Sequence, residues 1–233
     1  MSKYNNKVAA IIPFYNESGK IDKVINKVLQ FVEIVICVDD GSLDDYYTPI
    51  FLDHRVQLIK HEKNYGKGKA LNSGISAAIK KNMDYVICID GDLQHDPNFI
   101  PTFLTESANY DIVIGKRNFK SVSMPISRKM SNFFSSKILS ILSGRKILDS
   151  QSGYRLIKLK IFDNIVVRSN GFEAETELLL KASFNGYNIG FIPISTIYSE
   201  NDDSKIKNLN SIIGFVKIIV NCFYEKYKKK TKN

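Results

Sequence analysis

The chain has 233 residues, of which 44% are hydrophobic, and it carries a formal net charge of +9. This length and apolar content suffice for one large or two small folded domains and exclude a disordered tail protein. The charge is concentrated at one end, because residues 204–233 hold eight lysines and one glutamate, whereas residues 1–203 hold 25 basic and 23 acidic groups. A near-neutral body with a basic end argues against nucleic acid as a partner and favours an anionic membrane surface.

Short apolar segments alternate along the chain with segments of helical spacing. Strands are predicted at Val8–Ile12, Ile34–Val38, Val56–His61, Tyr85–Ile89, Asp111–Gly115 and Ile189–Pro193. Helices are predicted at Ser18–Phe31, Lys67–Asn82, Asn98–Ser107, Arg128–Ser143 and Phe172–Phe184. This alternation is typical of an α/β fold in which helices cover a mostly parallel sheet. We divide the chain into an α/β domain over residues 1–203 and an appendage over residues 204–233.

Polar side chains follow most of the predicted strands, at the sheet edge where ligands of open α/β folds bind. Asp90 and Asp92 leave the fourth strand at a spacing that puts both carboxylates on one side of an extended chain. Two such oxygen donors suit Mg²⁺ or Mn²⁺, and Gln94 can add a neutral oxygen. The alternative is a turn after a strand, in which Asp and Gly are common.

Two more segments at this edge have a composition that suits a nucleotide. Asp39 and Asp40 follow the second strand, where a carboxylate can accept hydrogen bonds from a base or ribose, although turn chemistry explains them as well. Residues 64–69 combine two glycines and two lysines near a helix start, which suits a phosphate. They lack the GxxxxGK[ST] pattern of a P-loop, and residues 13–18 lack the GxGxxG of a dinucleotide-binding protein.

Several segments together resemble family 2 glycosyltransferases in their order and spacing. They are VAAIIPFYNE, VDDGS, NYGKGKALNSGI, DGDLQHDP, IGKRN and DSQSGYR, and they span roughly residues 7–205. Within that family the chain is similar to the dolichol-phosphate mannosyltransferase and polyprenyl-phosphate glycosyltransferase branch. The resemblance implies a GT-A fold, a GDP- or UDP-linked sugar as donor, and inversion at the anomeric carbon.

The resemblance also implies roles for individual residues. Pro13, Tyr15, Glu17 and Asp39 match positions that hold the nucleoside, and Asp90, Asp92 and Gln94 match those that hold the divalent ion. We add Asp40 and Lys67 to the donor-binding set. The phosphates are assigned to Arg117, Arg128 and Lys205. For Arg128 and Lys205 the alternative is a solvated charge.

The acceptor side is assigned by the same resemblance to Asp149, Ser152 and Arg155, for which the alternative is a tight turn. The family's acidic position falls at Glu175 or Glu177, where the dipole of a helix start also favours acids. Asp92, Asp149, Arg117 and Glu175 form the predicted catalytic set.

Two kinds of acceptor remain open. A lipid phosphate is already anionic and needs no strong base, whereas a sugar hydroxyl requires a carboxylate, for which Asp149 or Glu175 is the candidate. The leading hypothesis is a metal-dependent enzyme that moves a hexose to a polyprenyl phosphate or related lipid. The alternatives are transfer to a hydroxyl of a growing glycan or glycolipid, and a non-catalytic module that binds sugar nucleotides or polysaccharide.

The C-terminal appendage is predicted to be an amphipathic helix from Leu209, followed by the basic segment KYKKKTK. Its apolar stretch is shorter than the roughly 20 residues that cross a bilayer. We expect it to lie on an anionic membrane, and the alternative is packing on the body or on a second copy, which would make a homodimer.

The expected location is cytoplasmic, at the inner face of the membrane. The first apolar run reaches Pro13 after five or six residues, which is too short for a signal-peptide core. Cys37, Cys88 and Cys222 match neither a disulfide framework nor a zinc site.

Overall fold

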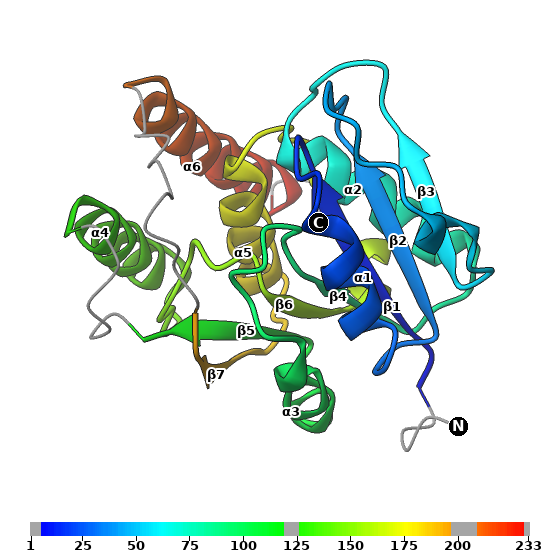
Figure 1. Ribbon diagram of the computed structural model, residues 1–233. Helices are drawn as coiled ribbons and strands as arrows, with labels where there is room; N and C mark the ends of the chain where they lie inside the picture. Colours follow the sequence, from blue (N-terminus) through cyan, green and yellow to red (C-terminus); the bar gives the residue numbers. More distant parts are fainter. Residues whose placement is uncertain (1–5, 119–125, 197–208, 231–233) are drawn as a thin grey trace.

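A seven-stranded sheet forms the centre of the molecule in the computed structural model, which describes residues 6–118, 126–196 and 209–230 (Figure 1). The strands are β1 (Val8–Phe14), β2 (Ile34–Asp39), β3 (Val56–Lys60), β4 (Tyr85–Cys88), β5 (Ile112–Arg117), β6 (Arg155–Lys158) and β7 (Ile189–Ile194). They lie in the order β3-β2-β1-β4-β6-β5-β7. Only β6 runs against its neighbours β4 and β5, so the prediction of a mostly parallel sheet is confirmed.

Helices cover both faces of the sheet and make a three-layer structure. They are α1 (Ile21–Val28), α2 (Lys67–Lys80), α3 (Ile100–Glu106), α4 (Ile126–Ser143), α5 (Glu173–Phe184) and α6 (Leu209–Lys230). Short 3-10 helices lie at η1 (Pro49–Leu52), η2 (Pro97–Phe99) and η3 (Leu159–Asp163). The predicted strands and helices all have a counterpart. Strand β6 was not predicted, because its sequence RLIK has only two apolar residues between charged ones and gives no clear strand pattern.

Alternate side chains of each strand enter two separate cores. On β1, Val8, Ala10 and Ile12 pack with α1 and α3, while Ala9 and Ile11 face α2 and α5 on the other side. Because a strand that is buried on both faces has no polar side, these strands are continuous apolar runs in the sequence. The two cores therefore fix the register of the central strands and the direction in which each strand ends.

Helix α6 packs one stripe of its surface against α5. Ile218 and Cys222 are buried there, and the ring of Phe223 lies 5.1 Å from that of Phe184. The Nζ of Lys181 lies 2.7 Å from Glu177 and 2.9 Å from Glu225 of α6, which joins the two helices by an ion pair. The helix thus contacts the body of the protein. The predicted boundary between the α/β domain and the appendage, at residues 203 and 204, lies outside the described residues. Among the described residues, no helix is both long and apolar enough to span a bilayer.

The packing of α2 on β1 depends on a glycine. A Cβ at Gly74 would lie 2.5 Å from Cγ2 of the fully buried Ile11. We predict that Gly74→Ala lowers the free energy of unfolding by about 1–3 kcal/mol through overpacking, although alanine is the better helix former. Urea denaturation measures the change.

Gly214→Ala in α6 is the matched control, because a Cβ there would have no heavy atom within 4 Å. This variant should be neutral or up to about 1 kcal/mol more stable. Equal stabilities of the two variants would contradict the close contact between α2 and β1.

Candidate active site

The carboxyl edge of the sheet brings together segments that are far apart in the sequence. Strands β1 to β5 end at this edge, and the reversed β6 begins there, since Arg155 pairs in register with Cys88 of β4 and with Ile114 of β5. The residues that follow β4 and the residues that precede β6 therefore meet. The antiparallel strand explains why the DSQSGYR segment lies beside the DGD segment.

A chain of alternating charges crosses this edge. The Nζ of Lys67, at the start of α2, lies 2.7 Å from Oδ1 of Asp90 and 3.1 Å from Oε1 of Glu175. The other oxygen of Glu175 lies 3.4 Å from Nη2 of the buried Arg155. Burial lowers the pKa of Lys67, but the two carboxylates outweigh it and raise this pKa overall. Burial on its own would raise the pKa of Asp90, but the positive charge of Lys67 outweighs this effect and lowers the pKa overall. Both groups are therefore held in their charged forms.

Asp92 differs from Asp90 in its electrostatic environment. Its Oδ1 accepts a hydrogen bond of 3.0 Å from the backbone N–H of Gln94. Burial, followed by the negative charge of Asp90, raises the pKa of Asp92 to about 6. The two carboxylates therefore repel each other, and a cation between them would relieve the repulsion.

Asp90 and Asp92 fit a divalent ion as a pair of ligands. A Cβ at Gly153 would come within 2.5 Å of Oδ2 of Asp90 and 2.7 Å of Nζ of Lys67, so glycine is needed to leave this space. Within the described ranges, no group of three His, Cys, Asp or Glu side chains is arranged to hold a metal. The donor set thus suits Mg²⁺ or Mn²⁺ that takes its remaining ligands from water and a bound diphosphate. The role of the Gln94 side chain as a further ligand stays a prediction.

Asp149 and Arg117 form a second ion pair. Nε and Nη2 of Arg117 each donate a hydrogen bond of 2.9 Å to the carboxylate of Asp149, which is fully buried. The backbone N–H of Gln151 donates to the same carboxylate at 3.2 Å. Both oxygens of Asp149 therefore accept hydrogen bonds. This bidentate pairing orients the guanidinium of Arg117 at the end of β5.

The two aspartates at the end of β2 have different partners. Asp39 accepts a hydrogen bond of 2.6 Å from the hydroxyl of Tyr46 and one of 2.8 Å from the N–H of Ser42. Asp40 accepts from the backbone N–H groups of Tyr65 and Gly66 at 3.0 and 2.8 Å. Asp40 thus anchors the loop that leads into α2. The assignment of both aspartates to the donor remains a prediction, and for Asp40 these contacts give a separate structural reason for an acid at this position.

The glycines of NYGKGKA have a packing role. A Cβ at Gly66 would lie 2.6 Å from the carbonyl oxygen of Asn170, and one at Gly68 would lie 2.6 Å from Cβ of Ala174. The sequence suggested a phosphate-binding loop here. The structure shows that these glycines let the start of α2 approach the start of α5, which is how Lys67 reaches Glu175.

The other predicted residues are placed as follows. Pro13 is buried at the end of β1, Tyr15 is half-buried, and Glu17 pairs with Lys20 at 2.8 Å. Ser152 is buried, and its hydroxyl has no hydrogen-bond partner among the described residues. Arg128 belongs to α4, and Lys205 lies outside the described residues.

His95 follows the DGD segment, and its position in the sequence favours a loop or supporting residue over a ligand. Its ring is buried 5.2 Å from that of Tyr154, and burial lowers its pKa to about 4, so the imidazole is neutral near pH 7. The spacing DGDLQH gives no signal of this contact, because Tyr154 comes from the DSQSGYR segment on the neighbouring strand.

Comparisons with known proteins agree on a family and a fold. Residues 9–172 match the family model described as glycosyl transferase family 2. The chain is 33% identical over 234 residues to the UDP-N-acetylglucosamine–dolichyl-phosphate N-acetylglucosaminyltransferase of Methanococcus voltae, with 88% of this chain and 90% of that protein covered. It is 28% identical over 220 residues to the undecaprenyl-phosphate mannosyltransferase of Micrococcus luteus, with 89% and 90% covered.

Among solved structures, glucosyl-3-phosphoglycerate synthase from Mycobacterium tuberculosis, in complex with Mn²⁺, UDP and glucosyl-3-phosphoglycerate, superposes with a TM-score of 0.70. The identity is 18%, and the match covers 95% of this chain and 80% of that one. This likeness confirms the predicted GT-A fold. The family match favours an enzyme over a non-catalytic binding module. The chain belongs to glycosyl transferase family 2 and is a glycosyltransferase.

Proposed function

We propose that this protein transfers a hexose from a nucleoside-diphosphate sugar to a polyprenyl phosphate at a membrane surface. The observation that carries the proposal is the state of the two carboxylates that were candidates for a catalytic base. Asp149 is bound through both oxygens to Arg117, and Glu175 lies between Lys67 and Arg155. A carboxylate held by cations is a weak base. The site therefore suits an acceptor that is anionic before it binds.

The relatives support this acceptor class. The proteins of Methanococcus voltae and Micrococcus luteus are named for dolichyl phosphate and undecaprenyl phosphate, and both align over most of their length. A hydroxyl acceptor would require a side chain that takes up its proton in the transition state. A phosphate monoester requires orientation and partial charge balance, which basic side chains at the site provide.

For the donor we favour a uridine diphosphate sugar. The Methanococcus voltae relative is named for a UDP-linked sugar, and the mycobacterial neighbour was solved with UDP and Mn²⁺. Asp90 and Asp92 would hold the divalent ion, which when bound balances the negative charge that develops on the leaving diphosphate. Arg117, oriented by Asp149, is assigned to the phosphates. Inversion at the anomeric carbon requires the acceptor to attack from the side opposite the diphosphate.

Exposed apolar side chains on two helices support a membrane surface as partner. On α6 they follow a single stripe, with exposed fractions of 53–67%, at Ile213, Val216, Val220, Tyr224 and Tyr227. On α4 they are Ile126, Met130, Phe133, Phe134, Ile138 and Ile141, exposed by 41–77%. Both helices pack against α5, and both lie on the side of the molecule away from β3 (Figure 1).

The charge of the chain end complements such a surface. Five lysines lie between residues 226 and 232. Each lysine near an anionic bilayer contributes up to about 1 kcal/mol, less after screening. We propose that the protein binds peripherally to the cytoplasmic face of an anionic membrane through α4 and α6.

The acceptor class is tested by comparing a polyprenyl phosphate with the polyprenol of equal chain length, with a radiolabelled UDP-sugar as donor. We predict that the phosphate is the better acceptor by roughly 100-fold or more, since general-base catalysis of hydroxyl attack is worth about that factor. Comparable transfer to the polyprenol would contradict the proposal and favour a hydroxyl acceptor.

The metal assignment is tested by Asp92→Asn. We predict that kcat/KM falls by roughly 100-fold or more and that Mn²⁺ binding, followed by electron paramagnetic resonance, weakens in parallel. Asp163→Asn removes an exposed carboxylate of η3 and should leave both measurements unchanged. Full activity in excess chelator would show that no divalent ion takes part.

The membrane surface is tested by flotation with vesicles of phosphatidylglycerol and phosphatidylcholine. Val216→Glu with Val220→Glu places two charges on the exposed stripe of α6 and should lower the bound fraction at least about fivefold. Leu43→Glu with Leu52→Glu changes two residues elsewhere that are even more exposed, and it should not lower the bound fraction. If the first pair instead splits a dimer in sedimentation velocity and leaves flotation unchanged, the stripe is a contact between two copies.

A further inference from the structure

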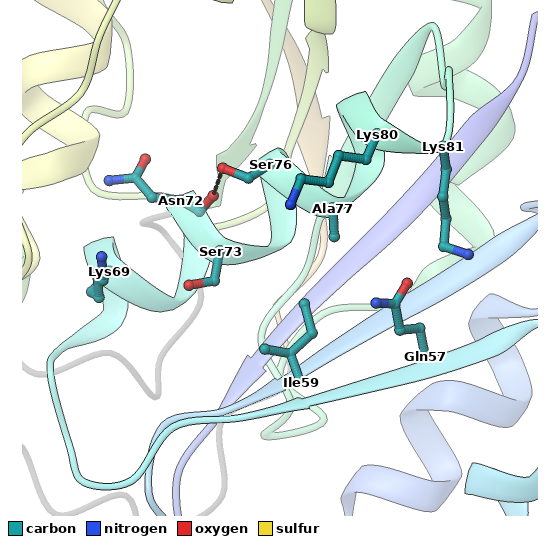
Figure 2. Close-up of a pocket in the computed structure, with 9 residues that line it drawn as sticks. All are labelled: Gln57, Ile59, Lys69, Asn72, Ser73, Ser76, Ala77, Lys80 and Lys81. Carbon is teal, nitrogen blue, oxygen red and sulfur yellow. Dashed lines mark hydrogen bonds between the residues drawn. The ribbon is translucent and has the colours of Figure 1, made fainter.

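A cavity of about 610 Å³ lies between α2 and the edge strand β3. We call it the α2–β3 groove, and its polar lining includes Gln57, Lys69, Ser73, Ser76, Lys80 and Lys81. In Figure 2 Lys69 stands at one end of the helix, and Lys80 and Lys81 extend from the other end over the groove. This set shares no residue with the ion pairs of the active site.

The groove has the charge of an anion site. Three of its lining residues are lysines, and its lining includes no aspartate or glutamate. A concave surface that carries one sign of charge concentrates ligands of the opposite sign. The volume is sufficient for a small phosphorylated metabolite.

A second observation restricts the ligand further. Oε1 of Gln57 is buried and has no hydrogen-bond partner in the described part of the chain. A buried acceptor of this kind is costly unless a donor reaches it. A ligand that fits the groove therefore presents a phosphate to the lysines and, once the Gln57 side chain turns into the groove that it lines, an O–H or N–H to its Oε1, as a sugar phosphate does.

Hydrogen bonds connect the groove to the active site. Nδ1 of His61 lies 2.7 Å from Asp40, and Nε2 lies 3.0 Å from Oγ of Ser73, which faces the groove. Because a carboxylate only accepts, Nδ1 donates to Asp40, and Nε2 shares a hydrogen bond with the Ser73 hydroxyl, which can donate or accept. Asp40 in turn holds the N–H groups of Tyr65 and Gly66, directly before Lys67.

The order Ser73, His61, Asp40 is that of a hydrolase triad, but its surroundings argue against hydrolysis. Ser73 lies in the middle of α2, where the backbone N–H groups are used within the helix. An acyl-transfer site needs such donors for its oxyanion. We therefore interpret the three residues as a connection between the groove and the loop at residues 64–66.

We propose that the α2–β3 groove is a second binding site, for a phosphorylated polyol, and that its occupancy changes the loop before Lys67 through Ser73, His61 and Asp40. A ligand that hydrogen-bonds to Ser73 redirects its hydroxyl away from His61. The imidazole and Asp40 then shift, and with them the backbone amides that set the start of α2. This inference goes beyond the proposed transfer reaction and does not depend on it.

Binding is tested by calorimetry with glucose 6-phosphate, glucose and inorganic phosphate as probes, without donor or acceptor. We expect glucose 6-phosphate to bind, and to bind about tenfold or more weakly to Lys80→Gln with Lys81→Gln. Lys23→Gln with Lys27→Gln, on the exposed face of α1 across the sheet, should change affinity by less than about twofold. Equal losses in both pairs would overturn the site, and equal affinity for inorganic phosphate would overturn the polyol assignment.

The connection is tested by backbone amide resonances. Glucose 6-phosphate should shift the signals of Tyr65 and Gly66 in the unaltered protein. In Ser73→Ala these shifts should disappear, while shifts at β3 and the end of α2 persist. If Tyr65 and Gly66 respond equally in both proteins, the connection through His61 is wrong. Neither the calorimetry nor the resonance measurement uses transfer activity. The outcome of both is therefore independent of the proposed enzyme reaction.

Discussion

The ion pairs of Lys67 with Asp90 and Glu175 are the interaction on which the site depends. Charged groups taken out of water are costly unless each has a partner of opposite sign at close range. Lys67 comes from the start of α2, Asp90 from the end of β4 and Glu175 from the start of α5. Three elements must therefore meet within hydrogen-bond distance. Gly66, Gly68 and Gly153 make this approach possible, because a side chain at any of them would collide with its neighbour.

The same arrangement separates two roles among the acidic side chains. Asp149 and Glu175 are engaged with arginine and lysine, so their charge orients cations. Asp92 forms no salt bridge with any described residue, and its raised pKa reflects burial beside another carboxylate. An added cation is therefore most favourable at Asp90 and Asp92. The electrostatics thus support the metal assignment independently of the motif.

Much of the fold follows from the sequence, and less of the site does. The buried strands β1, β2 and β4 are apolar on both faces, so their positions are evident from composition alone. Strand β6 is four residues long and its direction depends on pairing with β4 and β5, which no local pattern encodes. Asp90 and Asp92 were candidates from their spacing after a strand, which the resemblance favoured over a turn, whereas the residues of DSQSGYR were found by resemblance. Their partners were not, because the pairing of Lys67 with Asp90 and of Arg117 with Asp149 is set by tertiary packing.

The two faces of α6 show how one pattern can serve two surfaces. The sequence predicts an amphipathic helix, but it leaves open whether the apolar stripe meets protein or membrane. Ile218 and Cys222 are buried against α5, whereas Val216 and Val220 remain exposed. A helix that packs on its own domain needs only one apolar stripe to do so. The second apolar stripe of α6 therefore does not contribute to folding. Together with the exposed residues of α4 and the lysine-rich end, this stripe is what the proposed lipid-phosphate acceptor would require, because the enzyme would have to work where that acceptor is held.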